Sequence, residues 1–207
     1  MCGMPNTRTP KAATADDAPS VSRSLARAFD DDPLMSWLLP DAATRGERLG
    51  RYFTTLFRRQ YEPYAQCEFT ESAAAFWVPP ESRDKAVPDA DTVQELVDIL
   101  GDRAPLLRDV VAQVAAHTPP EPHWYLAVIG ADPLVRGQGH GAALLRSGLA
   151  RADAAGLPVH LESSKPDNIP FYAHFGFTVT TEIHPHPDGP PLWPMWRPAR
   201  GGTDGER

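Results

Sequence analysis

The chain contains a strand, a glycine-rich turn and a helix in direct succession near residue 136, and this combination constrains the fold more than any other feature. A dense apolar run over 124–129 predicts the strand, and the spacing of Leu144, Leu145 and Leu149 predicts the helix. Glycines in the intervening turn let the backbone approach a ligand closely. They also leave N–H groups at the helix N-terminus directed at one spot. The sequence therefore predicts a site for a phosphate-bearing ligand at this turn.

Hydrophobic periodicity and turn residues predict the other elements. We expect strands within 8–13 and over 64–71, 73–78, 123–131, 159–163, 178–183 and 192–197, and helices from 14 to 29, 43–61, 92–100, 104–116, 136–155 and 168–174. Pro33 is predicted to stop the first helix and to begin a loop, Asn168 to cap its helix, and Gly130 to mark a bulge or a close ligand approach. The order βαβαββ in the last part of the chain predicts an α/β (α+β) domain with a mixed sheet.

Composition limits the functional class. A chain of 207 residues with 42% apolar content fits one globular domain, which we place at 14–198, with a disordered segment at 1–13 and a flexible tail at 199–207. The sequence has no apolar run of membrane-spanning length, no signal peptide and only two cysteines, so we expect a cytoplasmic protein without a membrane partner. The net charge of −7 argues against a nucleic-acid partner and is compatible with an amine substrate.

Two ligands fit the glycine pattern. Gly137-Gln138-Gly139-His140-Gly141-Ala142 matches G-x-G-x-x-G/A, and Glu162 lies where a ribose-binding acid would be expected, which favours a dinucleotide. However, Asp132-Pro133-Leu134-Val135 intervenes between the strand and the turn. Only 70 residues remain after Gly137, whereas this fingerprint normally opens a doubly wound domain. The dinucleotide is therefore the less favoured alternative.

The second match is more specific. Arg136-x-x-Gly139-x-Gly141 resembles the R/Q-x-x-G-x-G/A signature of the GCN5-related N-acetyltransferase (GNAT) superfamily. Asn168, Phe171-Tyr172 and Phe175-Gly176-Phe177 resemble the second motif of that superfamily. The resemblance implies a mixed, mostly antiparallel sheet of six or seven strands, flanked by helices and splayed between the fourth and fifth strands.

Further segments resemble puromycin N-acetyltransferase and its actinobacterial relatives. These segments are Ala26-x-Ala28-Phe29, Trp77-x-Pro79-Pro80-Glu81-Ser82, Glu121-Pro122-x-Trp124, Leu161-Glu162-x-Ser164, Asn168-x-Pro170-Phe171-Tyr172 and Gly176-Phe177-Thr178-Val179-Thr180. The insert between Pro79 and Asp91 and the tail 184–194 match poorly, so the resemblance does not extend to puromycin as the substrate.

The resemblance implies acetyl transfer from acetyl-CoA, which leaves as CoA, to an amine. The pyrophosphate would lie against the turn, and the thioester would lie beside the end of the preceding strand. The implied cofactor-binding residues are Ile129, Gly130, Ala131, Arg136, Gly137, Gln138, Gly139, His140, Gly141, Ala142, Asn168, Phe171 and Tyr172. The His140 side chain is expected to face solvent.

The resemblance implies that Tyr172 acts as general acid for the departing thiolate; the alternative is a core aromatic beside Phe171 and Phe175. Glu162, at a strand end, is a candidate general base for the amine, and the alternative is that it only orders the turn after 163. His184-x-His186 lacks a third ligand at sensible spacing, so no metal is expected.

Residues that recognise the acceptor are less constrained. We consider Asp32, Trp37, Trp77 and His123, although solvation for Asp32 and core packing for the others are the alternatives. The expected acceptor is a small-molecule amine, such as an antibiotic or aminonucleoside, and the protein is expected to be a monomer or homodimer. Two other functions stay open: acetylation of a protein amine, which an enclosed acceptor groove would disfavour, and a non-catalytic acyl-CoA-binding regulatory module.

Overall fold

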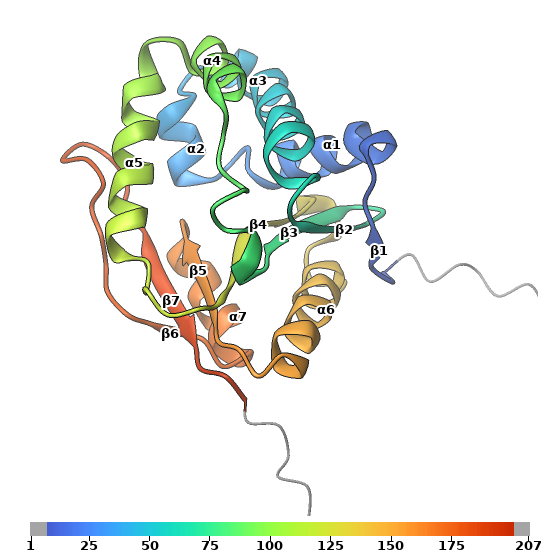
Figure 1. Ribbon diagram of the computed structural model, residues 1–207. Coiled ribbons are helices and arrows are strands. Elements are labelled where there is room, and N and C mark those ends of the chain that lie inside the picture. Colours follow the sequence, from blue (N-terminus) through green and yellow to red (C-terminus); the bar gives the residue numbers. More distant parts are fainter. Residues whose placement is uncertain (1–7, 201–207) are drawn as a thin grey trace, which may run out of the picture.

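A seven-stranded mixed sheet forms the centre of the computed structural model, which describes residues 8–200 (Figure 1). The strand order is β1-β2-β3-β4-β5-β7-β6, and every neighbouring pair is antiparallel except β4 and β5. The strands are β1 (Lys11–Ala12), β2 (Gln66–Thr70), β3 (Ala73–Val78), β4 (Trp124–Ala131), β5 (Val159–Ser163), β6 (Thr178–Val179) and β7 (Trp193–Arg197). The expected mixed, mostly antiparallel sheet is confirmed, although β6 is shorter than predicted.

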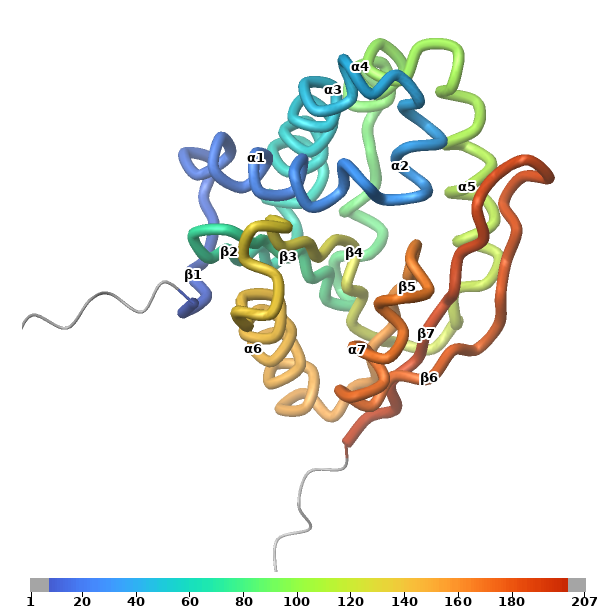
Figure 2. The backbone as a smooth tube through the Cα atoms, turned by 180° about the vertical axis from the view of Figure 1, so that it is seen from behind, coloured from blue at the N-terminus to red at the C-terminus, as the bar shows by residue number. Residues whose placement is uncertain are grey.

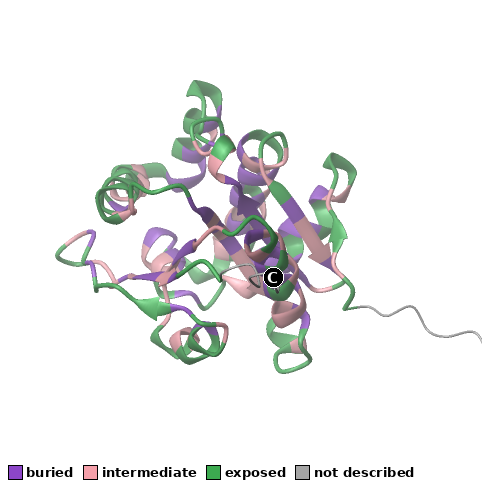
Figure 3. Ribbon diagram, turned by 60° about the horizontal axis from the view of Figure 1, so that its bottom comes forward, coloured by how far each residue is buried: buried purple, intermediate pink, exposed green. Residues whose placement is uncertain are grey.

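Helices cover both faces of the sheet (Figures 1 and 2). The α-helices are α1 (Ala18–Ala28), α2 (Pro33–Leu38), α3 (Ala42–Thr55), α4 (Ala90–Leu100), α5 (Ala104–His117), α6 (His140–Ala154) and α7 (Ile169–His174). Residues of α1, α3 and α4 form one apolar core with Phe76 and Val128, and residues of α6 and α7 form a second with Trp77 and Leu126. Figure 3 shows the buried residues concentrated in the sheet and in the inner faces of the helices.

Helix α2 replaces the loop that was expected after Pro33, so that prediction is wrong. Pro33 occupies the first position of the helix, where a backbone N–H would have no partner within the helix, so its absence removes no hydrogen bond. The Asp32 side chain caps the helix by accepting a hydrogen bond from the Met35 amide. Proline therefore starts a helix here instead of only ending the previous one. As a result, Asp32 is held at the turn between α1 and α2.

Strands β4 and β5 diverge, as expected for the fourth and fifth strands. Their parallel pairing comprises only Trp124 with Val159 and Tyr125 with His160. Beyond Tyr125, β4 continues to Ala131 along β3, and β5 continues to Ser163 along β7. The edge of β4 that faces β5 is therefore unpaired over its second half.

A bulge in β4 determines which side chains face the two cores. Phe76 pairs with Val128 and Trp77 with Leu126, so Ala127 is the extra residue. Ala127 and Val128 consequently both pack on the α1 side, after which the alternation resumes. The bulge that was considered for Gly130 therefore lies three residues earlier, and no sequence feature marks it.

Gly130 is needed for helix packing. A Cβ at this position would lie 2.8 Å from the Ala28 Cβ and 2.9 Å from the Phe29 ring. The groups that approach Gly130 closely are side chains of α1 and of Phe29, which follows it.

A disordered segment was expected at 1–13 and a flexible tail at 199–207. Most of these residues, 1–7 and 201–207, lie outside the described part of the chain. Within the described part, Lys11–Ala12 forms β1. Among the described residues, no helix is both long and apolar enough to cross a membrane.

Candidate active site

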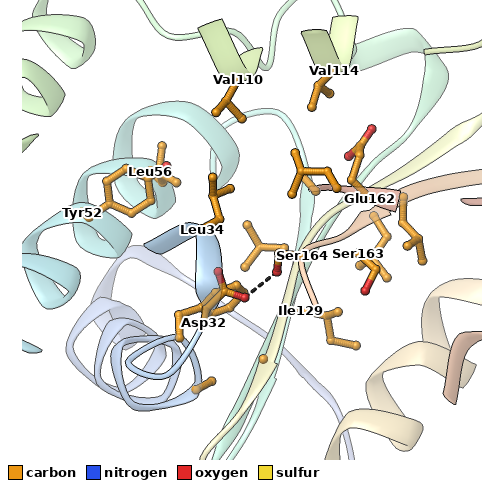
Figure 4. Close-up of a pocket in the computed structure, with 18 of the residues that line it drawn as sticks. Asp32, Leu34, Tyr52, Leu56, Val110, Val114, Ile129, Glu162, Ser163 and Ser164 are labelled. Atoms are coloured by element: carbon orange, nitrogen blue, oxygen red, sulfur yellow. Dashed lines mark hydrogen bonds between the residues drawn. The ribbon is translucent and has the colours of Figure 1, made fainter. Parts of the chain in front are cut away.

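A cavity of about 2200 Å³ opens where β4 and β5 diverge (Figure 4). It extends from the glycine turn, along β4, to side chains of α3, α4 and α5. Drug-sized ligands occupy pockets of roughly 300 to 1,000 Å³, so this cleft has room for two ligands side by side.

The glycine turn forms one end of the cleft. Gly137 and Gly139 have φ values of +78° and +88°, which favour glycine, and Gly139 is the residue that precedes α6. The first bond of the helix joins the Ala143 amide to the Gly139 carbonyl, so the amides of 140–142 have no partner within the helix. A Cβ built at 137, 139 or 141 would meet nothing within 4 Å, so the space beside the turn is open. This arrangement can bind a phosphate group.

Asp31 links both sides of the cleft. Its carboxylate accepts hydrogen bonds from Arg136 in the glycine turn, at 3.1 Å, and from Lys165 after β5. Partial burial opposes ionisation, but the bonds from Lys165 and Arg136 prevail and lower the pKa of Asp31. An anionic ligand at the turn would compete with Asp31 for Arg136.

The middle of the cleft contains Ile129, Gly130 and Ala131, all lining residues from the unpaired edge of β4. A strand edge carries backbone N–H and C=O groups that can pair with an extended ligand. The structure therefore brings the predicted thioester position and the predicted phosphate position into one cavity.

Tyr172 of α7 faces this cavity, and its side chain is buried. Its ring packs against Phe171 and Phe177, yet within residues 8–200 no hydrogen bond uses its hydroxyl group. Burial and, secondly, the Asp32 carboxylate raise the pKa of the Tyr172 phenol. The hydroxyl therefore keeps its proton at neutral pH. Tyr172 is a core residue and a cleft residue at once, so the two alternatives from the sequence are compatible.

Asn168 also lines the cleft, but its side chain makes no capping hydrogen bond to α7. Its backbone is already helical, because a short 3₁₀ turn, Pro166–Asn168, precedes the helix. The capping prediction is therefore wrong, and the amide group is not engaged by the helix N-terminus.

Glu162 projects from the end of β5 into the cleft (Figure 4). Two neighbouring side chains hold its carboxylate. The Tyr125 hydroxyl donates to one carboxylate oxygen at 2.8 Å, and His160 Nε2 lies 2.6 Å from the other. Burial, together with the nearby Glu162 carboxylate, raises the pKa of Tyr125, so its hydroxyl remains a donor. The carboxylate is fixed in position and 10% exposed, so it can still accept a proton from a molecule in the cleft.

Asp32 lies in the same cavity and accepts a hydrogen bond from Ser164, which follows β5. Figure 4 shows this bond crossing from the α1–α2 turn to the β5 side. Burial raises the pKa of Asp32 despite the bonds from Ser164 and the Met35 amide. Asp32 is the one member of the predicted acceptor set that lines the cleft.

The other three predicted acceptor residues lie away from it. Trp77 is fully buried against Gly148 of α6, and Trp37 packs on Gly189 and His186. His123 is buried behind the cleft, where its Nδ1 donates to the Glu121 carbonyl and its Nε2 accepts from Arg83. Core packing, the alternative for each, is what the structure shows.

His140 was expected to face solvent, and that prediction is wrong. Its side chain is buried, with Nδ1 3.0 Å from the Thr70 hydroxyl of β2. Its backbone still belongs to the glycine turn and lines the cleft. The side chain ties the start of α6 to the sheet.

From the sequence, His160 was only a weaker candidate for the general base, and Tyr125 was not recognised as a site residue. The available signal was the spacing: His160 and Glu162 are two residues apart on one strand and therefore share a face. Tyr125 could be placed there only by the pairing of β4 with β5, which brings it opposite His160.

The pH dependence of stability tests the surroundings of His123. Burial, reinforced by the Arg83 guanidinium, lowers the pKa of His123 below its usual 6.5. The unfolded chain then binds a proton that the folded chain excludes, so we expect the free energy of unfolding to fall as the pH drops below about 6.5. Urea unfolding of the wild type and of His123→Asn at pH 7.5 and 5.5 measures this; a slope that is unchanged in the variant would contradict the assignment.

Comparison with known proteins identifies the class. The model of the Acetyltransferase (GNAT) family matches residues 53–177, which is more than half of the chain. The matched region contains most of the cleft, including the glycine turn, Glu162 and Tyr172. The chain therefore belongs to the GNAT family of acetyltransferases, and its splayed sheet is the GNAT fold.

Individual relatives agree with this assignment. One similar solved structure is described as histone acetyltransferase HPA2 and related acetyltransferase from Corynebacterium glutamicum. Its superposition on this chain has a TM-score of 0.70, the two sequences are 28% identical, and the match covers 94% of this chain and 98% of that one. The structure of arylalkylamine N-acetyltransferase 2 of Aedes aegypti superposes on this chain with a TM-score of 0.55, and the match covers 91% of this chain and 97% of that one. The two sequences are only 11% identical, so this likeness shows a shared fold alone.

A curated relative matches over a shorter stretch. An uncharacterised N-acetyltransferase of Schizosaccharomyces pombe is 35% identical over 80 residues, which are 39% of this chain. The match spans only 32% of the yeast protein.

Proposed function

We propose that residues 14–198 form one domain that transfers an acetyl group from acetyl-CoA to the amine of a small molecule. The observation that carries this proposal is the single cleft between β4 and β5, which has the glycine turn at one end and Glu162 and Tyr172 in its walls. An antibiotic or aminonucleoside acceptor, as in the puromycin acetyltransferase group, is one form of this proposal. It rests on sequence motifs alone.

The residues present fit acetyl-CoA. The turn has open space beside three glycines and unpaired amides at the start of α6, which suits a diphosphate. Arg136 would add a positive charge, and Ile129–Ala131 would offer a strand edge to the pantetheine arm. When bound, acetyl-CoA supplies a thioester, whose acetyl group goes to the amine while CoA leaves as a thiol.

Glu162 is the proposed general base. An amine reaches the cleft mainly as an ammonium ion, because its pKa is about 10, and it must lose a proton before its nitrogen can attack. Glu162 Oε atoms accept that proton directly or through water. Tyr125 and His160 keep the carboxylate pointed into the cleft, so less freedom is lost when the acceptor binds.

Tyr172 is the proposed general acid. Its hydroxyl has no partner within residues 8–200, and its raised pKa keeps it protonated. A thiol has a pKa of about 8.5, so the Tyr172 proton moves to sulfur only as negative charge develops there. The hydroxyl therefore stabilises the departing thiolate first by a hydrogen bond.

Tyr172→Phe is expected to lower kcat by about 100-fold and to change the KM for acetyl-CoA little. A 100-fold loss is at the lower end of the range for removal of a general acid. Single-turnover kinetics with the most active amine measures the chemical step. Tyr64→Phe, which removes the hydroxyl of a tyrosine that is 43% exposed and does not line the cleft, is the control and should keep most of the activity. A Tyr172→Phe rate within threefold of the wild type would contradict the acid assignment.

Thermal unfolding with acetyl-CoA, followed by a CoA-release assay against primary amines, tests the proposed function. Ligand at 100 times its Kd adds about 2.7 kcal/mol of stability, which gives a clear rise in Tm. No rise in Tm would contradict the cofactor, and a rise without acetylation of any amine would favour the non-catalytic acyl-CoA-binding alternative.

Acetylation of a protein lysine is a second candidate function. The similarity to the Corynebacterium structure described as histone acetyltransferase HPA2 and related acetyltransferase favours it, and so does the net charge of −7, which would attract a basic peptide. A lysine-rich peptide that is acetylated with a higher kcat/KM than every small amine would establish this alternative.

A further inference from the structure

The cleft continues beyond Glu162 into an apolar chamber, on the side away from the glycine turn. Figure 4 shows side chains of α2, α3 and α5 around this space, with Glu162 at its edge. The chamber walls include Leu34, Tyr52, Leu56, Leu96, Val110 and Val114. Gln60, Arg83, Asp102, Arg108, Asp109 and Thr118 also line the cavity, but aliphatic and aromatic residues outnumber the polar ones in this part of the wall.

Exposed valines extend the apolar surface toward the mouth of the chamber. Val93 and Val97 of α4 are 45% and 40% exposed, Val111 of α5 is 58% exposed, and Val87 is 57% exposed. All four line the same cavity, although they come from three different segments. Apolar side chains that are left in water and gathered at one site indicate a binding surface.

The far wall of the chamber is closed by packing. Val110 forms a cluster with Ile183 and Leu192, and Leu34 and Trp37 pack against that cluster. Ile183 and Leu192 pair with each other in the segment that joins β6 to β7, here called the C-terminal hairpin. Helices α2 and α5 and the hairpin are thereby joined on this side (Figure 2). This side of the chamber is therefore closed.

Polar groups at the inner end complement an amine. The Glu162 and Asp32 carboxylates both line the cavity, and Glu162 is held ready by Tyr125 and His160. A peptide would bring backbone amides against the walls of α4 and α5, where the helix backbone is already hydrogen-bonded and the side chains are largely apolar. The hydroxyl groups of an amino sugar and the second ammonium group of a polyamine would likewise lose water against these apolar side chains.

We propose that the acceptor is a primary amine carried on a bulky apolar body, with the apolar body in the chamber and the nitrogen at Glu162. This inference rests on the proposed function and adds a substrate class to it. It predicts that affinity and kcat/KM rise with the apolar area next to the amine, while charged or hydroxylated amines of similar length are poor acceptors.

The test compares 2-phenylethylamine and hexylamine with 1,5-diaminopentane and 5-aminopentan-1-ol. Calorimetric titration into the CoA-bound protein measures binding, and CoA release measures kcat/KM. Burial of a phenyl-sized group is expected to favour the apolar amines by roughly 30-fold or more in both quantities. Equal or better binding of the polar amines would overturn the inference.

A pair of matched variants locates the effect. Val97→Asp places a charge at the chamber wall and is expected to weaken 2-phenylethylamine binding about 10-fold, while the acetyl-CoA-induced rise in Tm is retained. Val179→Asp is the control, because Val179 is 39% exposed, close to the 40% of Val97, but lies on β6 away from the cavity. Equal effects of the two variants would contradict the chamber as the acceptor site.

The outcomes separate the two proposals. Apolar amines that bind but are not acetylated would support the chamber and contradict the acetyl-transfer proposal. Polar amines that are acetylated faster than apolar ones would support acetyl transfer and overturn the substrate class.

Discussion

Replacing Glu162 by Gln is expected to lower kcat by about 100- to 10,000-fold at pH 7, the range for loss of a general base. Gln keeps the size of the side chain and can still bond to Tyr125 and His160, so the Tm should change little. The loss should shrink as the pH rises toward 10, because the amine then loses its proton to solvent before it binds. Steady-state rates from pH 6 to 10 measure both effects.

The chain offers a matched control for this variant. Glu182 also accepts from an imidazole two residues away, His184 at 3.0 Å, and from an aromatic side chain, Trp193 at 2.9 Å, but it lies on the surface. Glu182→Gln should leave kcat unchanged. If Glu162→Gln retained kcat within threefold of the wild type at pH 7, Glu162 would not be the base.

The second large effect concerns stability. Gly148→Ala is expected to lower the free energy of unfolding by about 3 kcal/mol, which corresponds to a Tm decrease of roughly 10 °C for a domain of this size. A Cβ at position 148 would lie 1.9 Å from the ring of Trp77, which is fully buried and cannot move aside without disturbing the sheet. Differential scanning calorimetry measures the change.

Gly46→Ala provides the contrast. Gly46 lies within α3, and a Cβ there would meet nothing within 4 Å, so the better helix propensity of alanine should raise stability by up to about 1 kcal/mol. A neutral or stabilising Gly148→Ala would show that Trp77 does not pack against α6 as described. Opposite signs for the two substitutions are the expected result.

Local patterns predicted much of the fold, because the elements of the second half are strongly marked. The strand Val159–Ser163 was located correctly, as was Ala73–Val78 in the first half, and α6 ends at Ala154, one residue before the predicted end at 155. Helix α2 was missed because a proline after three aspartates can either stop one helix or start another. Only the bond from Met35 to Asp32 shows which applies.

Contacts between distant segments account for what was not predicted. The bulge at Ala127 depends on the pairing of β3 with β4 and leaves no local signature. Trp77 belongs to the core because Gly148, 71 residues later, leaves room for its ring. Tyr125 reaches Glu162 only because β4 and β5 are parallel neighbours at their start. In each case the role depends on a partner far away in the sequence.

A crystal structure with bound CoA tests the central claim most directly, because that claim assigns each part of the ligand to a place in the cleft. The account predicts the diphosphate against the glycine turn and the amides of 140–142. It predicts the pantetheine arm along Ile129–Ala131, with the sulfur near the Tyr172 hydroxyl. CoA bound outside the space between β4 and β5, or bound there with its sulfur away from both Tyr172 and Glu162, would contradict it.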